Sequence, residues 1–285
     1  MVRKATGASY PAVSDRIIFE SEIPLPPVAE QKRIAAILDQ ADELKRKRAA
    51  SLETLSVIPI SIFHDRFGDP IANEMGWRTV RLKSVTLKIG SGATPTGGES
   101  SYKSNGISLI RSMNVHDGNF IREGLAFLDT TQAKKLDNVI VFDIDVLLNI
   151  TGASVARVCR CPKYVLPARV NQHVSIIRPN KMMDTTFLEG LLMYPSMKRY
   201  LLQIGEAGAT RQAITKAQLE ELEIPLPPLS AQREFADAIG RVVATRDKQS
   251  EHLAKLDVFF SSLQDRAFRG ELASEAAGRE LAEAS

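Results

Sequence analysis

The sequence predicts an α+β fold: one mixed, mainly antiparallel α/β domain plus two long helices that pair as an antiparallel coiled coil. Three observations predict it. A proline-rich segment occurs twice, 201 residues apart. Each copy precedes a long stretch with apolar residues at helical spacing. Between the two helical stretches lie short runs of alternating apolar and polar residues, which are typical of strands.

The duplicated segment reads Glu-Ile-Pro-Leu-Pro-Pro at 22–27 and again at 223–228. Prolines fix φ and restrict the residue before them, so each copy should be an extended lead-in to the helix that follows. The spacing is far too long for a solenoid repeat and indicates that one architectural unit was duplicated. The same register places residues 1–22 opposite the end of the middle domain, so we expect them to be the tail of a preceding domain. The motif positions are Pro24, Pro26, Pro27 and Gln31 in the first copy, and Pro225, Pro227, Pro228 and Gln232 in the second.

The first helical stretch runs from about Ala29 to Phe67, which corresponds to roughly 58 Å of helix. Pro59 should kink this helix or end its regular part near Val57. The second stretch stops at Phe268-Arg269-Gly270 and has no internal proline. Neither helix can bury its apolar stripe alone, so we expect the two to pair. Both join the middle domain, and the pairing should therefore be antiparallel.

The middle of the chain predicts a twisted, mainly antiparallel sheet and one helix over 187–202. A glycine-rich segment at 90–98 should form a mobile loop. The residues after Leu272 are polar and rich in Ala and Glu, and they predict frayed helix or disorder. The expected strands cover 77–82, 85–89, 106–111, 139–142, 145–150, 155–158 and 173–178.

The bulk composition is that of an ordinary soluble protein, with 44% hydrophobic and 25% charged residues. No run of 18 apolar residues or apolar signal core is present, so we expect a cytoplasmic location and no membrane partner. The net charge of +3 is unevenly distributed. Residues 71–222 hold 19 Lys/Arg and 13 Asp/Glu, which makes the middle domain the basic part and favours a polyanionic partner there.

Motifs of catalysis are missing. The loop at 90–98 lacks the ending of a phosphate-binding loop, and neither a dinucleotide fingerprint nor the Asn-Pro-Pro-aromatic motif of amino-methylating enzymes occurs. Cys159 and Cys161 suit neither a disulfide framework nor a four-ligand zinc site, and we interpret them as plain strand residues. His116-Asp117 should lie in a hairpin turn, and Asp143 and Asp145 in a turn between strands. We therefore predict no catalytic residue, metal or cofactor on this chain.

Polar and basic side chains in the middle domain suggest binding instead. Arg, Asn and Gln can read base edges with two hydrogen bonds, whereas Lys, Ser and Thr mostly hold phosphates. The alternative for each is a solvated strand face or turn. The DNA-binding candidates are Lys88, Ser91, Thr94, Lys103, Arg111, Asn114, Arg157, Arg160, Lys163, Arg169, Asn171, Gln172 and Arg211.

Taken together, these motifs resemble the specificity subunits of type I restriction–modification systems. The match rests on the doubled Ile-Pro-Leu-Pro-Pro-x-x-x-Gln-(Lys/Arg), on Phe-Arg-Gly-Glu-Leu at 268–272 and on Trp-x-x-Val-x-Leu at 77–82. It also rests on Gly-x-Gly-x-Thr-Pro at 90–95 and Gly-Ala-Thr at 208–210. The resemblance covers nearly the whole chain.

The resemblance implies a non-catalytic subunit that reads double-stranded DNA and docks modification and restriction subunits. It places S-adenosylmethionine, ATP and magnesium on those partners. The implied organisation is a remnant tail at 1–22, a spacer helix at 23–70, a target-recognition domain at 71–222, a second spacer helix at 223–272 and a polar tail at 273–285.

The chain departs from the full family pattern because it has both spacer helices and only one complete recognition domain. We therefore expect a truncated or half-type subunit, of which two copies could associate as a homodimer. One alternative is a coiled-coil scaffold or decoy that binds methylase subunits without reading DNA. A standalone methyltransferase or nuclease ranks third, because its motifs are missing.

Overall fold

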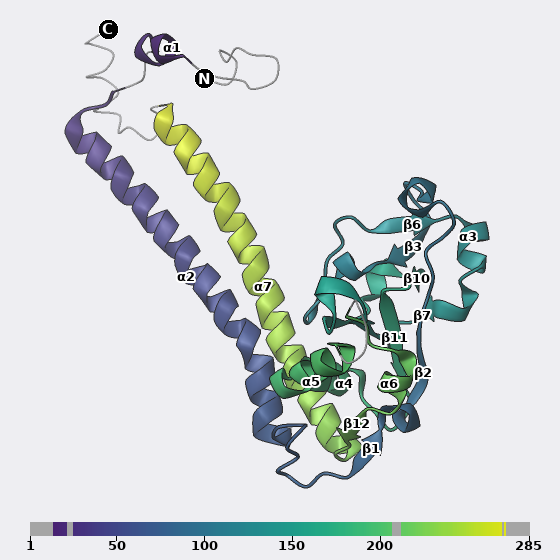
Figure 1. Cartoon of the computed structure of the whole chain (residues 1–285). Coiled ribbons are helices and arrows are strands. Elements are labelled where there is room, and N and C mark those ends of the chain that lie inside the picture. Colours follow the sequence, from purple (N-terminus) through teal and green to yellow (C-terminus); the bar gives the residue numbers. More distant parts are fainter. Residues whose placement is uncertain (1–13, 22–24, 207–211, 270, 272–285) are drawn as a thin grey trace. The chain divides into compact units, whose positions relative to one another are not determined.

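The computed structural model describes residues 14–21, 25–206, 212–269 and 271 (Figure 1). The internal contacts divide the chain into two units. One comprises residues 1–53 and 246–285, and the other residues 54–245. Within the described part of the chain, no helix is long and apolar enough to cross a membrane.

Two helices of 40 residues carry the repeat. They are α2 (Val28–Phe67) and α7 (Leu229–Phe268), and the bounds of α7 are those of α2 moved by 201 residues. Of the two effects predicted for Pro59, an end of the helix near Val57 is wrong, because α2 continues through Pro59 and ends at Phe67, the last residue of the predicted stretch. Phe63 and Phe67 on the last turns are buried in the core of residues 54–245. Their burial offsets the hydrogen bond that proline cannot donate.

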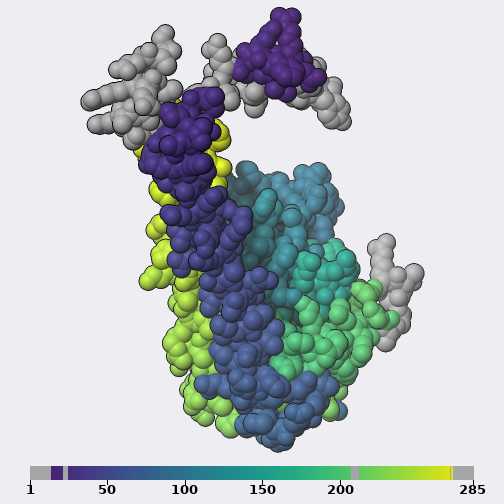
Figure 2. Space-filling model, turned by 90° about the vertical axis from the view of Figure 1, so that its left-hand side faces the viewer, coloured from purple at the N-terminus to yellow at the C-terminus, as the bar shows by residue number. Residues whose placement is uncertain are grey.

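The two helices pair in antiparallel fashion in both units, as predicted. In the first unit, Lys45 Nζ lies 2.8 Å from Asp257 Oδ1 and 4.6 Å from the ring centroid of Phe260, and Arg48 donates to Gln249. In the second unit, Arg66 contacts Glu234 at 3.1 Å. Residues nearer the C-terminus of α2 therefore contact residues nearer the N-terminus of α7. Figures 1 and 2 show the helices side by side, α2 in purple to blue and α7 in yellow-green.

Two four-stranded sheets make up most of the second unit. Their strand orders are β2-β11-β8-β9 and β6-β3-β10-β7, and the pair β10–β3 alone is parallel among the pairings that the structure describes. A mainly antiparallel sheet is therefore confirmed. The strands are β1 Thr79–Arg81, β2 Thr86–Ser91, β3 Ile107–Ile110, β4 Val115–His116, β5 Asn119–Phe120, β6 Ala126–Leu128, β7 Ile140–Val141, β8 Val146–Asn149, β9 Val158–Arg160, β10 Ala168–Val170, β11 Val174–Pro179 and β12 Glu223–Pro225.

Alternate residues of the central strands serve two different cores. Val146 and Leu148 of β8 point into a core with Phe63, Phe67 and α4, whereas Leu147 between them packs in a second core with β3, β6 and β10. This alternation follows from the period of two along a strand. Because both faces of the sheet are covered, β8 is buried at every position. The helices besides α2 and α7 are α1 Asp15–Phe19, α3 Thr130–Lys134, α4 Thr185–Met193, α5 Pro195–Glu206 and α6 Lys216–Glu220.

The single helix predicted at 187–202 is wrong, because the structure has two helices there, α4 and α5. Tyr194 between them is extended, with φ −61° and ψ 136°. It precedes Pro195, whose ring disfavours the helical region for the residue before it. Pro195 then occupies the first helical position of α5, where its missing N–H has no cost.

Two further boundaries differ from expectation. The predicted loop at 90–98 begins later, because Gly90 and Ser91 extend β2. The predicted strand at 155–158 is wrong, since β9 starts only at Val158. Ala156 there has φ 65°, a left-handed conformation that strands do not adopt. The turn predicted at His116-Asp117 is confirmed, because the hairpin β4–β5 encloses Asp117 and Gly118.

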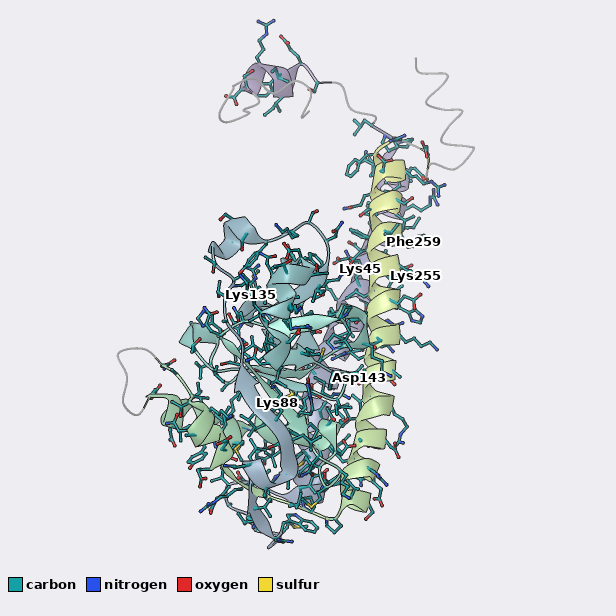
Figure 3. The ribbon with its side chains drawn as sticks, turned by 90° about the vertical axis from the view of Figure 1, so that its right-hand side faces the viewer. Lys45, Lys88, Lys135, Asp143, Lys255 and Phe259 are labelled. Carbon is teal, nitrogen blue, oxygen red and sulfur yellow. The ribbon has the colours of Figure 1, made fainter. Side chains whose placement is uncertain are left out.

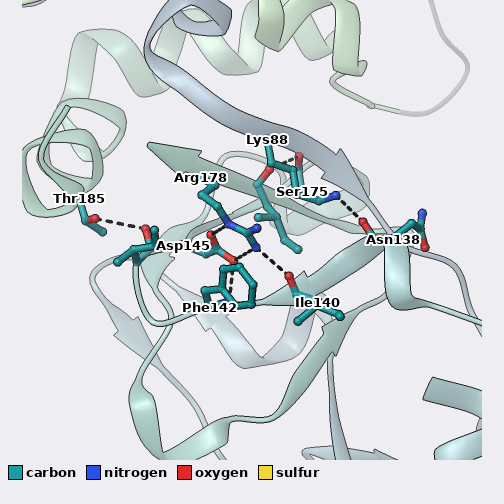
Figure 4. Close-up of polar contacts among 10 residues, drawn as sticks. Lys88, Asn138, Ile140, Phe142, Asp145, Ser175, Arg178 and Thr185 are labelled. Carbon is teal, nitrogen blue, oxygen red and sulfur yellow. Dashed lines mark hydrogen bonds and ion pairs between the residues drawn. The ribbon is translucent and has the colours of Figure 1, made fainter. Parts of the chain in front are cut away.

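A buried ion pair holds the turn between β7 and β8, where Asp143 and Asp145 were expected (Figure 4). Arg178 Nε donates to Asp145 Oδ1 at 2.7 Å, and Asp145 is fully buried. The same guanidinium lies 3.9 Å from the ring centroid of Phe142 and donates to the carbonyl of Ile140 at 2.8 Å. Burial of a charge requires such partners. Asp145 is therefore a structural residue of this turn.

Candidate nucleic-acid interface

Five of the predicted DNA-binding residues have side chains engaged inside the second unit. Arg111 is the clearest case, with only 16% of its side chain exposed. It donates to Glu99 Oε1 and to the carbonyl of Gly124, both at 2.7 Å, and lies over the ring of Tyr102. The other four are Asn114, Arg160, Arg169 and Asn171.

The remaining two arginines of this group are paired with carboxylates. Arg160 donates to Glu189 Oε2 at 2.7 Å, and Arg169 to Asp137 Oδ1 at 2.7 Å. Only 9% of the Arg169 side chain is exposed. Each of these guanidiniums therefore has part of its donor set committed within the fold.

The two asparagines shape the backbone around them. Asn114 is fully buried, accepts a hydrogen bond from the N–H of Arg111 at 3.0 Å and donates to the carbonyl of Ile121 at 2.9 Å. Asn171 Oδ1 accepts from the N–H of His173 at 3.0 Å. Both amides therefore fix turns from within the fold.

The predicted lysines lie on the surface with different partners. Lys163 is 85% exposed and sits 3.6 Å from Asp143, and Lys103 is 3.5 Å from Asp129. Lys88 on β2 donates to the carbonyl of Asn138 (Figures 3 and 4). With Lys83 and Lys216 it lines a cleft of about 380 Å³ that also contains Glu220. Ser91 is half-buried at the end of β2, opposite Ser175 of β11.

Among the candidate arginines that the structure describes, Arg157 is the one without an ion pair or side-chain hydrogen bond to a described residue. It is half-buried and lines a pocket of about 680 Å³. The 3₁₀ turn Gly152–Ser154 forms one wall, and an antiparallel bridge from Thr151 to Ala213 closes another. The polar side chains lining the pocket are Ser112, Thr151, Ser154, Arg157, His173 and Gln212.

A chain of hydrogen bonds connects the glycine-rich loop to this pocket. Thr94 Oγ1 contacts Gln172 Oε1, and Gln172 Nε2 lies 2.9 Å from His173 Nε2. His173 Nδ1 in turn lies 2.5 Å from Thr151 Oγ1. Gly92 allows the loop to approach, because a Cβ there would lie 1.9 Å from the carbonyl oxygen of Val170. The structure therefore brings together predicted Thr94, Gln172 and Arg157.

Sequence reasoning missed most of the pocket. Thr151 precedes the 3₁₀ turn and Ser154 ends it, and neither these two residues nor His173 are among the predicted DNA-binding candidates. The segment Thr151-Gly152-Ala153-Ser154 does indicate a turn, because small polar residues with glycine between strands are typical of turns. Predicted Arg211 lies outside the described residues, next to Gln212 of the pocket wall.

The two copies of the proline motif have different surroundings. Gln232 is fully buried and donates to the carbonyl of Pro227 at 2.8 Å, while its Oε1 accepts from the N–H of Asp184 at 2.8 Å. Gln31 makes the equivalent bond to the carbonyl of Pro26 at 2.8 Å but is exposed. Pro225 is paired with Thr79 between β12 and β1, and Pro228 accepts the N–H of Gln232. Pro27 likewise accepts the N–H of Gln31, whereas Pro24 lies outside the described residues.

The two cysteines are buried free thiols. Burial, with the charges of Asp145 and Asp143 adding to it, raises the pKa of Cys161 to about 12. Burial and then Glu189 raise the pKa of Cys159 as well. Metals bind the thiolate, so this environment opposes coordination. In the described part of the chain, no three His, Cys, Asp or Glu residues come together as a metal site would require.

Comparison with known proteins identifies relatives along most of the chain. Residues 2–54 and 74–256 match the family model for the type I restriction modification DNA specificity domain. The type I restriction enzyme MjaVIII specificity subunit of Methanocaldococcus jannaschii is 26% identical over 268 residues, which cover 87% of this chain and 62% of that protein. The EcoBI specificity subunit of Escherichia coli is 26% identical, covering 92% of this chain and 61% of that protein.

Solved structures show the same fold. The HsdS subunit from Thermoanaerobacter tengcongensis is 26% identical with a TM-score of 0.53, covering 94% of this chain and 65% of that one. A chain from a study of complex assembly and conformational transition in the type I R-M system is 27% identical, with a TM-score of 0.63 and coverage of 93% and 65%. This chain spans less than two thirds of the length of these relatives.

Proposed function

The chain belongs to the family of type I restriction modification DNA specificity domains, and on that premise we propose that it is a DNA sequence-recognition subunit of a type I restriction–modification complex. Its recognition domain, residues 71–222, reads one half-site of double-stranded DNA. The observation that carries the proposal is the extent of the family match, which includes residues 28–54 of α2, residues 229–256 of α7 and the sheets between them. The pocket lined by Arg157 supports it independently, since a guanidinium without a partner among the described residues is suited to a base edge or a phosphate.

The long helices α2 and α7 are proposed to dock the modification and restriction subunits as spacer helices, 23–70 and 223–272. Large apolar side chains of α7 are exposed, with 73% of Val258 and 55% of Phe259 accessible (Figure 3). Exposed apolar side chains on a paired helix favour a protein partner. In this arrangement, S-adenosylmethionine, ATP and magnesium would be held by the partner subunits, and this chain would position them on DNA without catalysing a reaction.

We also propose that two copies of this chain associate as a homodimer. Leu25 and Val28 of the first motif are 69% and 65% exposed, whereas their counterparts Leu226 and Leu229 are half-buried. The first motif therefore retains apolar surface that its copy covers. Sedimentation with modification subunits present should show two copies per complex. A single copy at every concentration would contradict the homodimer and leave DNA recognition untouched.

Selection from a randomised pool of duplex DNA tests the function. We expect the chain together with modification subunits to enrich a defined sequence, with each wrong base pair costing about 1–3 kcal/mol. The competing possibility is a coiled-coil scaffold or decoy that binds methylase subunits without reading DNA. Stable binding of the modification subunit without any sequence enrichment would favour that scaffold and overturn the proposal.

A further inference from the structure

The contacts around the pocket that Arg157 lines indicate which of its groups donate hydrogen bonds and which accept them. The hydroxyl of Thr94 donates to Gln172 Oε1, and this contact sets the orientation of the Gln172 amide. Its Nε2 can only donate, and it faces His173 Nε2 at 2.9 Å. In this arrangement Nε2 of His173 accepts the hydrogen bond, which places the ring proton on Nδ1.

The contact with His173 determines how the hydroxyl of Thr151 is used. His173 Nδ1–H donates to Thr151 Oγ1 at 2.5 Å, so this oxygen is already an acceptor. The hydroxyl proton of Thr151 remains free to donate, and Thr151 lines the pocket. The relay thus leaves the hydroxyl proton of Thr151 available to a ligand, beside the second acceptor lone pair of its oxygen.

Arg157 adds the main donor group of the pocket. Its guanidinium has five N–H donors and no acceptor, and none is committed to a described residue. Gln212 donates its amide N–H to Glu206 at 2.8 Å and so leaves an acceptor oxygen at the rim. Of the described side chains that line the pocket, Arg157 is the one with a permanent charge.

The backbone around Arg157 is held in uncommon conformations. Ala156, which precedes it, has φ 65°, and Gly152 in the neighbouring 3₁₀ turn has φ 74°. The N–H of Ala156 donates to the carbonyl of Asn149 at 2.9 Å, and the N–H of Asn149 donates to the carbonyl of Arg157 at 2.8 Å. Left-handed conformation in a residue with a Cβ is costly and persists only where its surroundings impose it. Here it turns the chain so that Arg157 faces the pocket instead of continuing β9.

We propose that this pocket takes the acceptor-rich edge of a guanine, with Arg157 donating to O6 and N7 and Thr151 contributing a further donor. The inference rests on the proposed function and deepens it, because it names the base that one part of the recognition domain reads. Guanine presents two adjacent acceptors in the major groove, and paired donation by arginine is the commonest specific contact to it. His173 and Gln172 are positioning residues that act through Thr151.

The composition of the pocket favours a base over a phosphate. Met113, Ala153 and Ala213 are among its lining residues, and apolar walls suit a flat base better than a hydrated anion. A phosphate site would be expected to gather several cations or backbone N–H groups. The cleft with Lys83, Lys88 and Lys216 has that character, whereas this pocket does not.

The experiment uses the complete chain with its modification subunits and the duplex that it enriches from a randomised pool. Each guanine of the site is replaced in turn by 7-deazaguanine, which lacks the N7 acceptor. For the wild-type chain, we expect one replacement to weaken binding about tenfold, because a good arginine–guanine contact is worth about one to two orders of magnitude. Arg157→Ala should abolish preference for guanine at that position only. Thr151→Val should reduce it several-fold, and Thr151→Ser, which keeps the hydroxyl, should retain it.

The possible outcomes distinguish failure of the proposed function from failure of the guanine inference. If the wild-type chain enriches no sequence, the proposed function fails. If it enriches a site but Arg157→Ala and 7-deazaguanine leave every guanine preference intact, the guanine inference alone is overturned. Uniform weakening of all sequences by Arg157→Ala, with a shallower salt dependence, would assign Arg157 to a phosphate and also overturn it. Arg81→Ala, on a 64% exposed side chain that lies outside the pocket and is not a DNA-binding candidate, serves as the matched control.

Discussion

Helices α2 and α7 have the same length and the same repeat register, yet they are buried at opposite ends. In α7 the N-terminal side is buried, with Gln232 and Phe235 both fully inaccessible. In α2 the C-terminal side is buried, with Phe63 and Phe67 at 0% and 2% exposure. Both buried ends belong to the unit of residues 54–245. The duplicated sequence therefore specifies the helix, whereas contacts with the adjoining domain determine which end of each helix is buried.

The largest expected effect comes from substitutions at a matched pair of phenylalanines, one in each helix. Phe67 and Phe268 occupy the same repeat position but are 2% and 76% exposed. Phe67 packs against the rings of Phe187 and Phe235, with centroids 4.9 and 5.6 Å away. Phe67→Ala should lower the free energy of unfolding by about 3–5 kcal/mol, because it leaves a cavity in the core. Phe268→Ala should change it by less than about 0.5 kcal/mol.

Urea unfolding followed by circular dichroism measures both variants. Equal losses for the two variants would show that the helix position, and not the domain around it, determines the energy. The same experiment on Phe187→Ala checks the site from the facing helix α4.

A second pair compares the two glutamines of the proline motif. Gln232→Ala should destabilise the protein by about 2–3 kcal/mol, because the buried N–H of Asp184 and the carbonyl of Pro227 lose their partner. Gln31→Ala removes an exposed bond to Pro26 and should cost less than about 0.5 kcal/mol. Hydrogen exchange at the amide of Asp184 provides a local measurement. Unchanged protection of that amide in Gln232→Ala would contradict the assigned role.

The smallest expected effect concerns the pairing of the two helices in the first unit. Lys45 contacts Asp257 and lies over the ring of Phe260 (Figure 3 labels Lys45). Lys45→Ala should cost about 0.5–1 kcal/mol, since partly exposed ion pairs and cation–π contacts are weak. The ion-pair part should shrink at 1 M salt, where the Debye length is about 3 Å. A double-mutant cycle with Asp257→Ala isolates it, and a coupling energy that salt does not change would contradict an ionic contribution.

Much of the fold was available from the chain itself. The 201-residue repeat predicted two equivalent helices, and α2 and α7 reproduce that spacing at both ends. The alternating runs predicted β2, β3, β7, β8 and β11, but they missed β6 and β10 and misplaced β9. The errors occurred where tertiary contacts override local preference, as at Pro59, which α2 passes because its last turns are buried. They also occurred where a local rule was overlooked, as at Pro195, which separates α4 from α5.

The candidate site was less predictable than the fold. Sequence alone nominated Arg111, Arg157, Arg160 and Arg169 equally, because side-chain chemistry does not reveal which carboxylates will be near. Tertiary structure distinguishes them by pairing Arg111, Arg160 and Arg169 with Glu99, Glu189 and Asp137. Arg157 remains uncommitted among the described residues and lines the pocket.

By itself, the sequence determined the periodic features of this protein: the duplication, the long helices and the basic middle region. These depend on residues close in the chain, or on a register that can be read without coordinates. Only the tertiary structure decided which copy of the motif is buried, which candidate arginine has no partner among the described residues and how Thr94, Gln172, His173 and Thr151 form one relay. Those properties depend on side chains that are up to 78 residues apart in the sequence and in contact only after folding, so no local pattern encodes them.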